Sequence, residues 1–216
     1  MHGNEIPAAL LRMPHVEPGM AVGLFGGSFN PPHEGHVLVA ETALRRLRLD
    51  QLWWIVTPGN PLKDHGALAS LATRMDLSRK IVHDPRVKFT AFEAVHNLSY
   101  TSETLEFVLS RNRGVDFVWV MGADNLAGFH HWQNWQAIAN RVPIAVVDRP
   151  GSTLSYLSSV MAKTFGHARV DEMQSVALAR MRPPAWTFIH GPRSPLSSTA
   201  LRNSGASGRS ETGQNG

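Results

Sequence analysis

The sequence predicts a single-domain α/β protein, in which helices cover both faces of a doubly wound parallel sheet. Short apolar runs of strand length alternate along the chain with stretches whose apolar residues recur at helical spacing. The run at residues 117–121 is apolar without interruption, as in strands that are buried on both faces. Strands that alternate with helices favour a parallel sheet, and 216 residues are enough for one substantial core.

Six segments have the length and composition of strands. They are residues 21–25, 52–56, 87–90, 117–121, 144–147 and 186–189. Helical spacing or capping residues predict helices from His36 onward, over 70–82, over 102–110, and over 154–180 with a break near Gly166. In a parallel sheet of this kind, ligands bind beyond the carboxyl ends of the strands.

The two ends of the chain differ in composition from its middle. We interpret residues 1–19 as a flexible N-terminal leader, because they show little periodicity and do not resemble a secretory signal. Residues 20–203 are expected to form the folded domain. Residues 204–216 are rich in Ser and Gly and are expected to be a disordered tail.

The overall composition narrows the choice of location and partner. The chain has no cysteine and no run of about 18 apolar residues, so we expect a cytoplasmic protein without a membrane span. The net charge of +4 and the pI near 10.0 are compatible with nucleic acid or with small polyanionic substrates. Because Lys and Arg are scattered and form no basic block, we expect no nucleic-acid partner.

A glycine-rich turn separates the first predicted strand from the first predicted helix, and residues 23–36 read GLFGGSFNPPHEGH. Gly26 and Gly27 allow the backbone to approach a ligand closely, and the helix N-terminus that follows suits a phosphate. His33 and His36 can donate hydrogen bonds to phosphoryl oxygens. A tight turn with incidental histidines is the alternative. A metal pair is less favoured, because no cysteine and no third regularly spaced ligand accompany them.

A second pattern follows the last predicted strand. Ser198 and Thr199 stand where a helix is expected to begin, and Arg202 follows one turn later. Hydroxyls, exposed amides and a guanidinium together can bind an anion. For the hexapeptide at residues 197–202 taken alone, an ordinary helix N-cap with a solvent-facing arginine is the favoured explanation.

Taken together, these motifs resemble those of the nucleotidyltransferase superfamily, whose HxGH motif appears as HEGH and whose ISSTxxR motif appears as LSSTALR. Intermediate segments are similar to the nicotinate-nucleotide adenylyltransferases: SYTSETL at 99–105, GADN at 122–125, FHHWQNW at 129–135 and RPG at 149–151. The resemblance covers about residues 20–203 and implies a Rossmann-like fold. Asn30 stands where many members have Asp, and a Ser/Gly-rich stretch replaces their further C-terminal helix.

The resemblance implies transfer of AMP from ATP to nicotinate mononucleotide, which yields nicotinate adenine dinucleotide and pyrophosphate. It also implies Mg²⁺ bound with ATP and no covalent intermediate, and it leaves a homo-oligomer open. An adenylyltransferase acting on nicotinamide mononucleotide or phosphopantetheine is the nearest alternative. A non-catalytic nucleotide-binding or RNA-binding module is the alternative from another class.

The resemblance also assigns roles to individual residues. The expected catalytic residues are His33, His36 and Arg202. The residues expected to bind ATP are Gly26, Gly27, Ser28, Phe29, Gly122, Asp124, Ser198 and Thr199. Those expected to bind the mononucleotide are Lys63, Tyr100, Thr101, Trp132, Gln133 and Arg149. Lys63 could equally be a solvated surface lysine, and we expect Trp135 to belong to the core while Trp132 faces the ligand.

Overall fold

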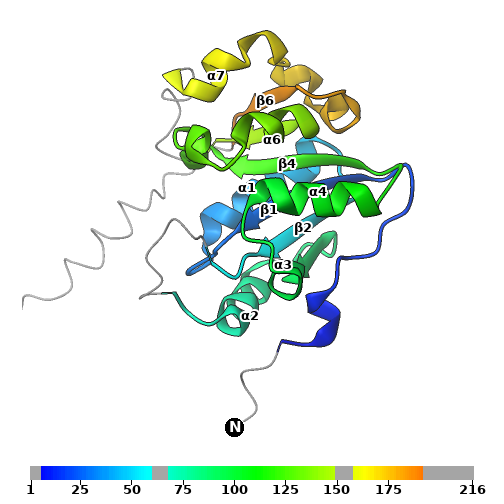
Figure 1. Cartoon of the computed structure of the whole chain (residues 1–216), viewed down its shortest axis with the longest axis vertical. Coiled ribbons are helices and arrows are strands. Elements are labelled where there is room, and N and C mark those ends of the chain that lie inside the picture. The colour runs from blue at the N-terminus through cyan, green and yellow to red at the C-terminus, as the bar shows by residue number, and fades with distance from the viewer. Residues whose placement is uncertain (1–5, 60–67, 149–157, 192–216) are drawn as a thin grey trace, which may run out of the picture.

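The computed structural model describes residues 6–59, 68–148 and 158–191, and its centre is a six-stranded parallel sheet in the order β3-β2-β1-β4-β5-β6 (Figure 1). The strands are β1 (Ala21–Gly27), β2 (Gln51–Val56), β3 (Val87–Thr90), β4 (Asp116–Gly122), β5 (Ile144–Val147) and β6 (Trp186–Ile189). Every pairing between neighbours is parallel. The six predicted strands and the α/β class are therefore confirmed.

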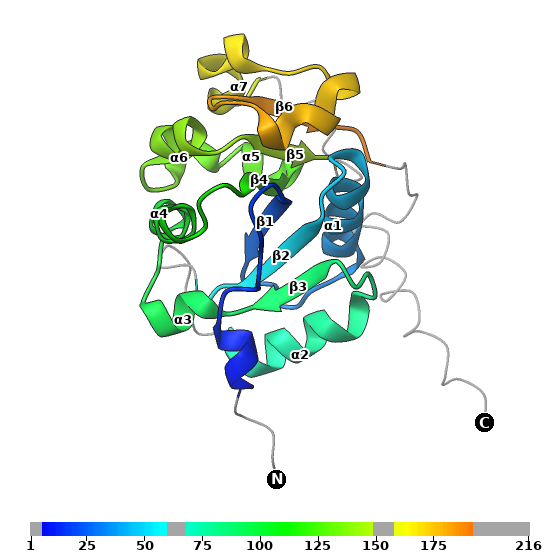
Figure 2. The ribbon, with the colours of Figure 1, turned by 90° about the vertical axis from the view of Figure 1, so that its right-hand side faces the viewer.

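Helices lie on both sides of this sheet, with α1 on one side and α4 and α6 on the other (Figure 2). The α-helices are α1 (Glu34–Arg46), α2 (Leu71–Ile81), α3 (Phe92–His96), α4 (Thr101–Arg111), α5 (Ala123–Leu126), α6 (Trp135–Arg141) and α7 (Val160–Thr164). The 3-10 helices are η1 (Ala8–Leu11), η2 (Phe129–His131), η4 (Gly166–Ala168) and η5 (Glu172–Arg180). Within the described ranges, no helix is long and apolar enough to cross a membrane.

The central strands are buried on both faces, which is why their sequences are continuous apolar runs rather than alternating ones. In β2, Trp54 packs into the cluster that α1 and α2 cover, whereas Trp53 packs into the cluster beneath α3, α4 and α6. Both indoles are fully buried. The doubly wound arrangement follows from this two-sided burial.

Residues 6–19 differ from the flexible leader expected from the sequence. Leu10 and Leu11 pack against the core, the carbonyl of Leu10 accepts the amide of Ala91 at 2.7 Å, and the carbonyl of Arg12 accepts the Thr90 hydroxyl at 2.7 Å. The segment thus covers the end of β3, an edge strand. Its contacts are with residues far along the chain, so local periodicity carried no sign of them.

Candidate functional site

A cavity of about 240 Å³ opens at the carboxyl ends of β1, β2 and β4. This is the edge where the order of strands changes direction, because β1 pairs with β2 on one side and with β4 on the other. Ten residues predicted for the site lie in its wall: Gly26, Gly27, Ser28, Phe29, His36, Tyr100, Thr101, Asp124, Trp132 and Gln133. The fold therefore brings together segments that are up to about a hundred residues apart in the chain.

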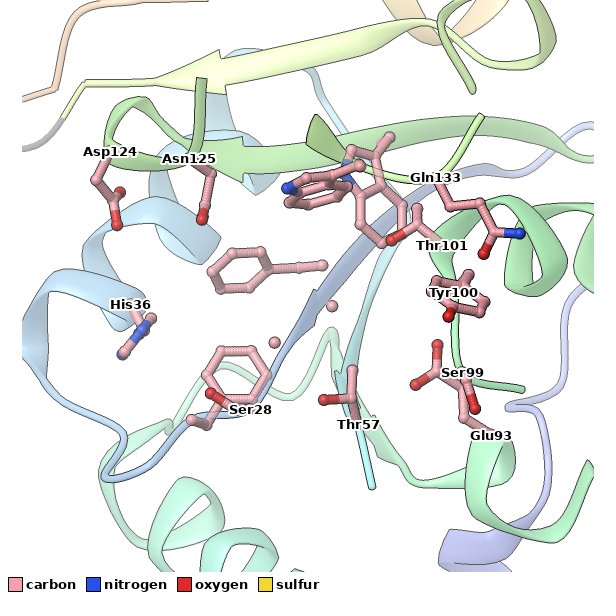
Figure 3. Close-up of a pocket in the computed structure, with 16 residues that line it drawn as sticks. Ser28, His36, Thr57, Glu93, Ser99, Tyr100, Thr101, Asp124, Asn125 and Gln133 are labelled. Carbon is pink, nitrogen blue, oxygen red and sulfur yellow. The ribbon is translucent and has the colours of Figure 1, made fainter. Parts of the chain in front are cut away.

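Most of the labelled side chains lie at two opposite ends of the cavity, and Ser28 and Thr57 lie along the wall between them (Figure 3). His36, Asp124 and Asn125 lie at one end. Tyr100 and Gln133 lie at the other, together with residues 99 and 101. The two ends of the cavity therefore carry different side chains.

The two histidines of the motif are held by the helix start itself. His33 is the N-cap of α1, and its Nδ1 accepts the amide of Gly35 at 3.1 Å. The Nδ1 of His36 accepts the amide of His33 at 3.2 Å, and the two rings lie 3.9 Å apart between centroids. Because each Nδ1 is an acceptor, each neutral ring carries its proton on Nε2. His36 thus presents a donor at the cavity wall.

The turn after β1 is shaped by aromatic rings on both sides. A Cβ at Gly26 would lie 2.9 Å from Cη2 of Trp119, so only glycine allows the strand to pass this indole. Phe29 adopts a φ of +46°, and its ring stacks on Trp54 with 4.3 Å between centroids. Phe29 was expected to bind ATP; it lines the cavity, but it is 2% exposed and belongs to the core.

Indole rings form the wall between β4 and the η2 segment. Trp132 lines the cavity and meets Trp119 edge to face, with 6.2 Å between centroids. Trp135 packs on Phe129 and Phe165 instead. Both indoles are partly buried against the same apolar cluster, and Trp132 lines the cavity whereas Trp135 does not.

Glu93, which the sequence analysis did not single out, is a buried carboxyl group in the cavity wall. Its Oε1 accepts the hydroxyl of Thr104 from the first turn of α4. Burial raises the pKa of Glu93 to about 7, the negative charge of Glu103 adds to this, and the hydrogen bond from Thr104 opposes it. Glu103 itself accepts the amides of Ser99 and Tyr100, which fixes the start of α4 at the cavity.

Several predicted residues are not in the cavity wall. His33 is exposed beside His36, and Gly122 ends β4 one residue before α5. The other predicted residues, Lys63, Arg149, Ser198, Thr199 and Arg202, lie outside the described residues. Their proposed roles stay predictions.

Further wall residues were missed by the sequence analysis: Phe25, Thr57, Glu93, Ser99, Trp119 and Asn125. A signal existed for Thr57, which directly follows a predicted strand, and for Asn125, which belongs to the GADN segment. Glu93 is the second residue of α3, where no motif marks it. Trp119 looks like any other apolar residue of a buried strand.

A phosphate-suited turn at the change of strand order is typical of proteins that bind nucleotides. The family model described as cytidylyltransferase-like matches residues 24–204, and the chain belongs to this family. A curated relative from Mesorhizobium japonicum, described as a probable nicotinate-nucleotide adenylyltransferase, is 66% identical over 190 residues, which are 88% of this chain and 97% of the relative. One from Rhizobium meliloti with the same description is 68% identical over 85% of this chain and 98% of its own.

Solved structures agree with the fold. The nicotinic acid mononucleotide adenylyltransferase of Plasmodium falciparum, complexed with NaAD, aligns with a TM-score of 0.63 over 85% of this chain and 83% of that one. The identity is 14%, so this likeness supports the architecture and not the individual residues.

We expect Gly26→Ala to damage nucleotide binding more than folding. The added Cβ would meet a rigid indole at 2.9 Å, so Trp119 would have to move into the cavity. Calorimetric titration with Mg-ATP should show binding weakened by about tenfold or more. Gly128→Ala is the matched control, because a Cβ there meets nothing within 4 Å. Equal affinity in both variants would contradict the close packing of Gly26 on Trp119.

We expect the stability of the protein to depend on pH through Glu93. Its pKa is raised from 4.5 to about 7 in the folded state, so its contribution to stability is fully present below about pH 4.5 and is lost as the pH rises through about 7. Glu93→Gln keeps an acceptor for Thr104 and removes the titration. Relative to this variant, the wild type should lose about 2–3 kcal/mol of unfolding free energy between pH 5 and pH 8.

Urea unfolding at the two pH values measures this difference. Glu41→Gln, at an exposed position, is the control. The unfolding free energy of this variant should change with pH as that of the wild type does. A difference between the wild type and Glu93→Gln that is constant with pH would show that burial does not shift the Glu93 carboxyl.

Proposed function

We propose that this protein transfers AMP from ATP to nicotinate mononucleotide, releasing pyrophosphate and nicotinate adenine dinucleotide. The observation that carries the proposal is one cavity with the HxGH turn at one end and the start of α4 with Gln133 at the other. Relatives more than 60% identical over most of the chain, which are described as probable nicotinate-nucleotide adenylyltransferases, support this choice of reaction.

At the phosphate end, the protein's task is to position the reactants and to stabilise charge. In-line transfer of a phosphoryl or nucleotidyl group requires no protein nucleophile. The Nε2 proton of His36, set by the hydrogen bond at Nδ1, would donate to the α-phosphate as negative charge builds on it. Gly26 and Gly27 let the rings of Trp119 and Phe29 pack against the backbone beside which the phosphates would lie. Arg202 with Ser198 and Thr199 would hold the leaving pyrophosphate.

At the other end, the start of α4 and Trp132 would bind the pyridine nucleotide. The face of an indole can stack on a pyridine ring. The amides at the start of a helix are suited to a carboxylate. The amide of Tyr100 already donates to Glu103, so the amide of Thr101, the first residue of α4 and part of the cavity wall, would take this role. Selection of the acid over the amide would follow from this donor. Lys63 and Arg149 would add positive charge for the substrate phosphate and carboxylate.

Mg²⁺ would reach the cavity bound to ATP. This ion is usually held by one or two carboxylates, by water and by the phosphates of the substrate rather than by a protein cage. Among residues 6–59, 68–148 and 158–191, no three potential ligand side chains surround one point, and Asp124 lies in the wall on the same side as His36. These residues fit an ion that brings most of its ligands with it and that neutralises phosphate charge.

The direct test is pyrophosphate release from Mg-ATP with nicotinate mononucleotide and nicotinamide mononucleotide offered in parallel. We expect a preference for the acid, because helix-start amides bind a carboxylate more strongly than a neutral carboxamide. Equal use of the two would indicate a dual-specificity enzyme. No release with either, under conditions in which Mg-ATP binds, would favour the non-catalytic binding module.

We expect His36→Ala and His36→Asn to reduce kcat by about 100- to 1,000-fold, because a preorganised donor to the transition state is lost. In His36→Asn, the side-chain Oδ1 can accept the backbone N–H of His33 in place of Nδ1. This variant therefore keeps the helix cap and loses the Nε2 donor. Mg-ATP should still bind to both variants. His83→Ala, which removes an exposed histidine after α2, is the control for charge and fold. An unchanged kcat in His36→Asn would remove His36 from the catalytic group.

A further inference from the structure

Arg74 is a buried arginine behind the cavity wall. It lies in the first turns of α2, it is 1% exposed, and its guanidinium bonds to four backbone carbonyls. Nη1 donates to the carbonyls of Ser28 at 2.6 Å and Thr57 at 2.7 Å. Nη2 donates to Pro58 at 3.2 Å, and Nε donates to Ala69 at 2.9 Å.

These carbonyls belong to three separate segments. Ser28 follows β1, Thr57 and Pro58 follow β2, and Ala69 precedes α2. Ser28 and Thr57 line the cavity, and Figure 3 shows their side chains in the same part of its wall. One planar guanidinium therefore ties the two strand ends that form this wall.

The charge of Arg74 is not neutralised by a carboxylate in the described part of the chain, where its partners are backbone carbonyls. Burial lowers the pKa of this guanidinium from its ordinary value, although an arginine stays protonated. Keeping a cation in the interior costs free energy even when its N–H groups are hydrogen-bonded. An apolar side chain of similar size would avoid this cost, but it could not donate to the four carbonyls.

We infer that Arg74 is a positioning residue for the proposed transfer: it holds the carbonyls of Ser28 and Thr57 so that the turn after β1 meets the phosphates in one fixed geometry. The inference rests on the proposed function. Arg74 does not line the cavity, so it acts through these two residues and not on the substrate. A second hydrogen bond also links the turn after β1 to the residues before α2: Oδ1 of Asn30 accepts the amide of Ala69 at 3.2 Å.

The test is Arg74→Lys, with Arg74→Gln as a second variant. Lysine keeps the charge, but its donors diverge from a single nitrogen and cannot reproduce the fork that serves four carbonyls. We expect folded protein whose kcat is about 10- to 100-fold lower, because small misplacements of reacting groups cost this much. The KM for nicotinate mononucleotide should change by less than about threefold, and the Kd for Mg-ATP should rise about tenfold. Glutamine should lose at least as much kcat.

Arg79→Lys is the matched control, since Arg79 is an exposed arginine of the same helix. A lower Tm for Arg74→Lys, with unchanged kcat per folded molecule and unchanged Kd for Mg-ATP, would show a purely structural role and overturn the inference. Failure of both Arg74 variants to fold would overturn it too.

Failure of the proposed function gives a different result. The wild type would then release no pyrophosphate with either mononucleotide. If the wild type still bound Mg-ATP and Arg74→Lys weakened that binding, Arg74 would keep its positioning role at a nucleotide site while the transfer reaction was abandoned.

Discussion

Parallel pairing on both sides of β1 is the constraint on which the rest of this structure depends. Because all six strands run in the same direction, their carboxyl ends meet at one edge of the sheet. The connection from β1 leads to β2 on one side, and β4 lies on the other, so the loops diverge and leave a cavity between them. Residues from the ends of β1, β2 and β4 can share one ligand for this reason alone.

The turn at the end of β1 is held by packing as much as by its glycines. Trp119 lies against Gly26, and Trp54 carries the ring of Phe29. Close-packed aromatic rings move little, so the backbone amides beside them keep their places. Phe29 and Trp119, which belong to the two apolar clusters, thus also line the cavity, so stability and site geometry share residues here.

Two buried ionisable groups flank the cavity, and each is satisfied differently. The guanidinium of Arg74 is bonded to backbone carbonyls, whereas the carboxyl of Glu93 accepts one hydroxyl and has its pKa raised by burial. Burying an ionisable group lowers the free energy of unfolding relative to an apolar residue that packs equally well. Arg74 lies behind the turn after β1, and Glu93 lies in α3 and accepts a hydrogen bond from α4, so polar contacts that an apolar core would not supply hold both parts of the cavity wall.

The sequence by itself determined the six strands and the doubly wound class, because these depend on local patterns, and its resemblance to the adenylyltransferases pointed to most of the cavity wall. Continuous apolar runs identify strands buried on both faces, and the HxGH turn lies within one stretch of chain. The histidine contacts are equally local, since each Nδ1 accepts an amide two or three residues away. Only the tertiary structure decided the packing of residues 6–19 on β3, the place of Trp119 against Gly26, and the contacts of Glu93 and Arg74. The partners of these residues lie in other strands and helices. The periodicity of a single sequence reports local structure and does not show which distant residues meet.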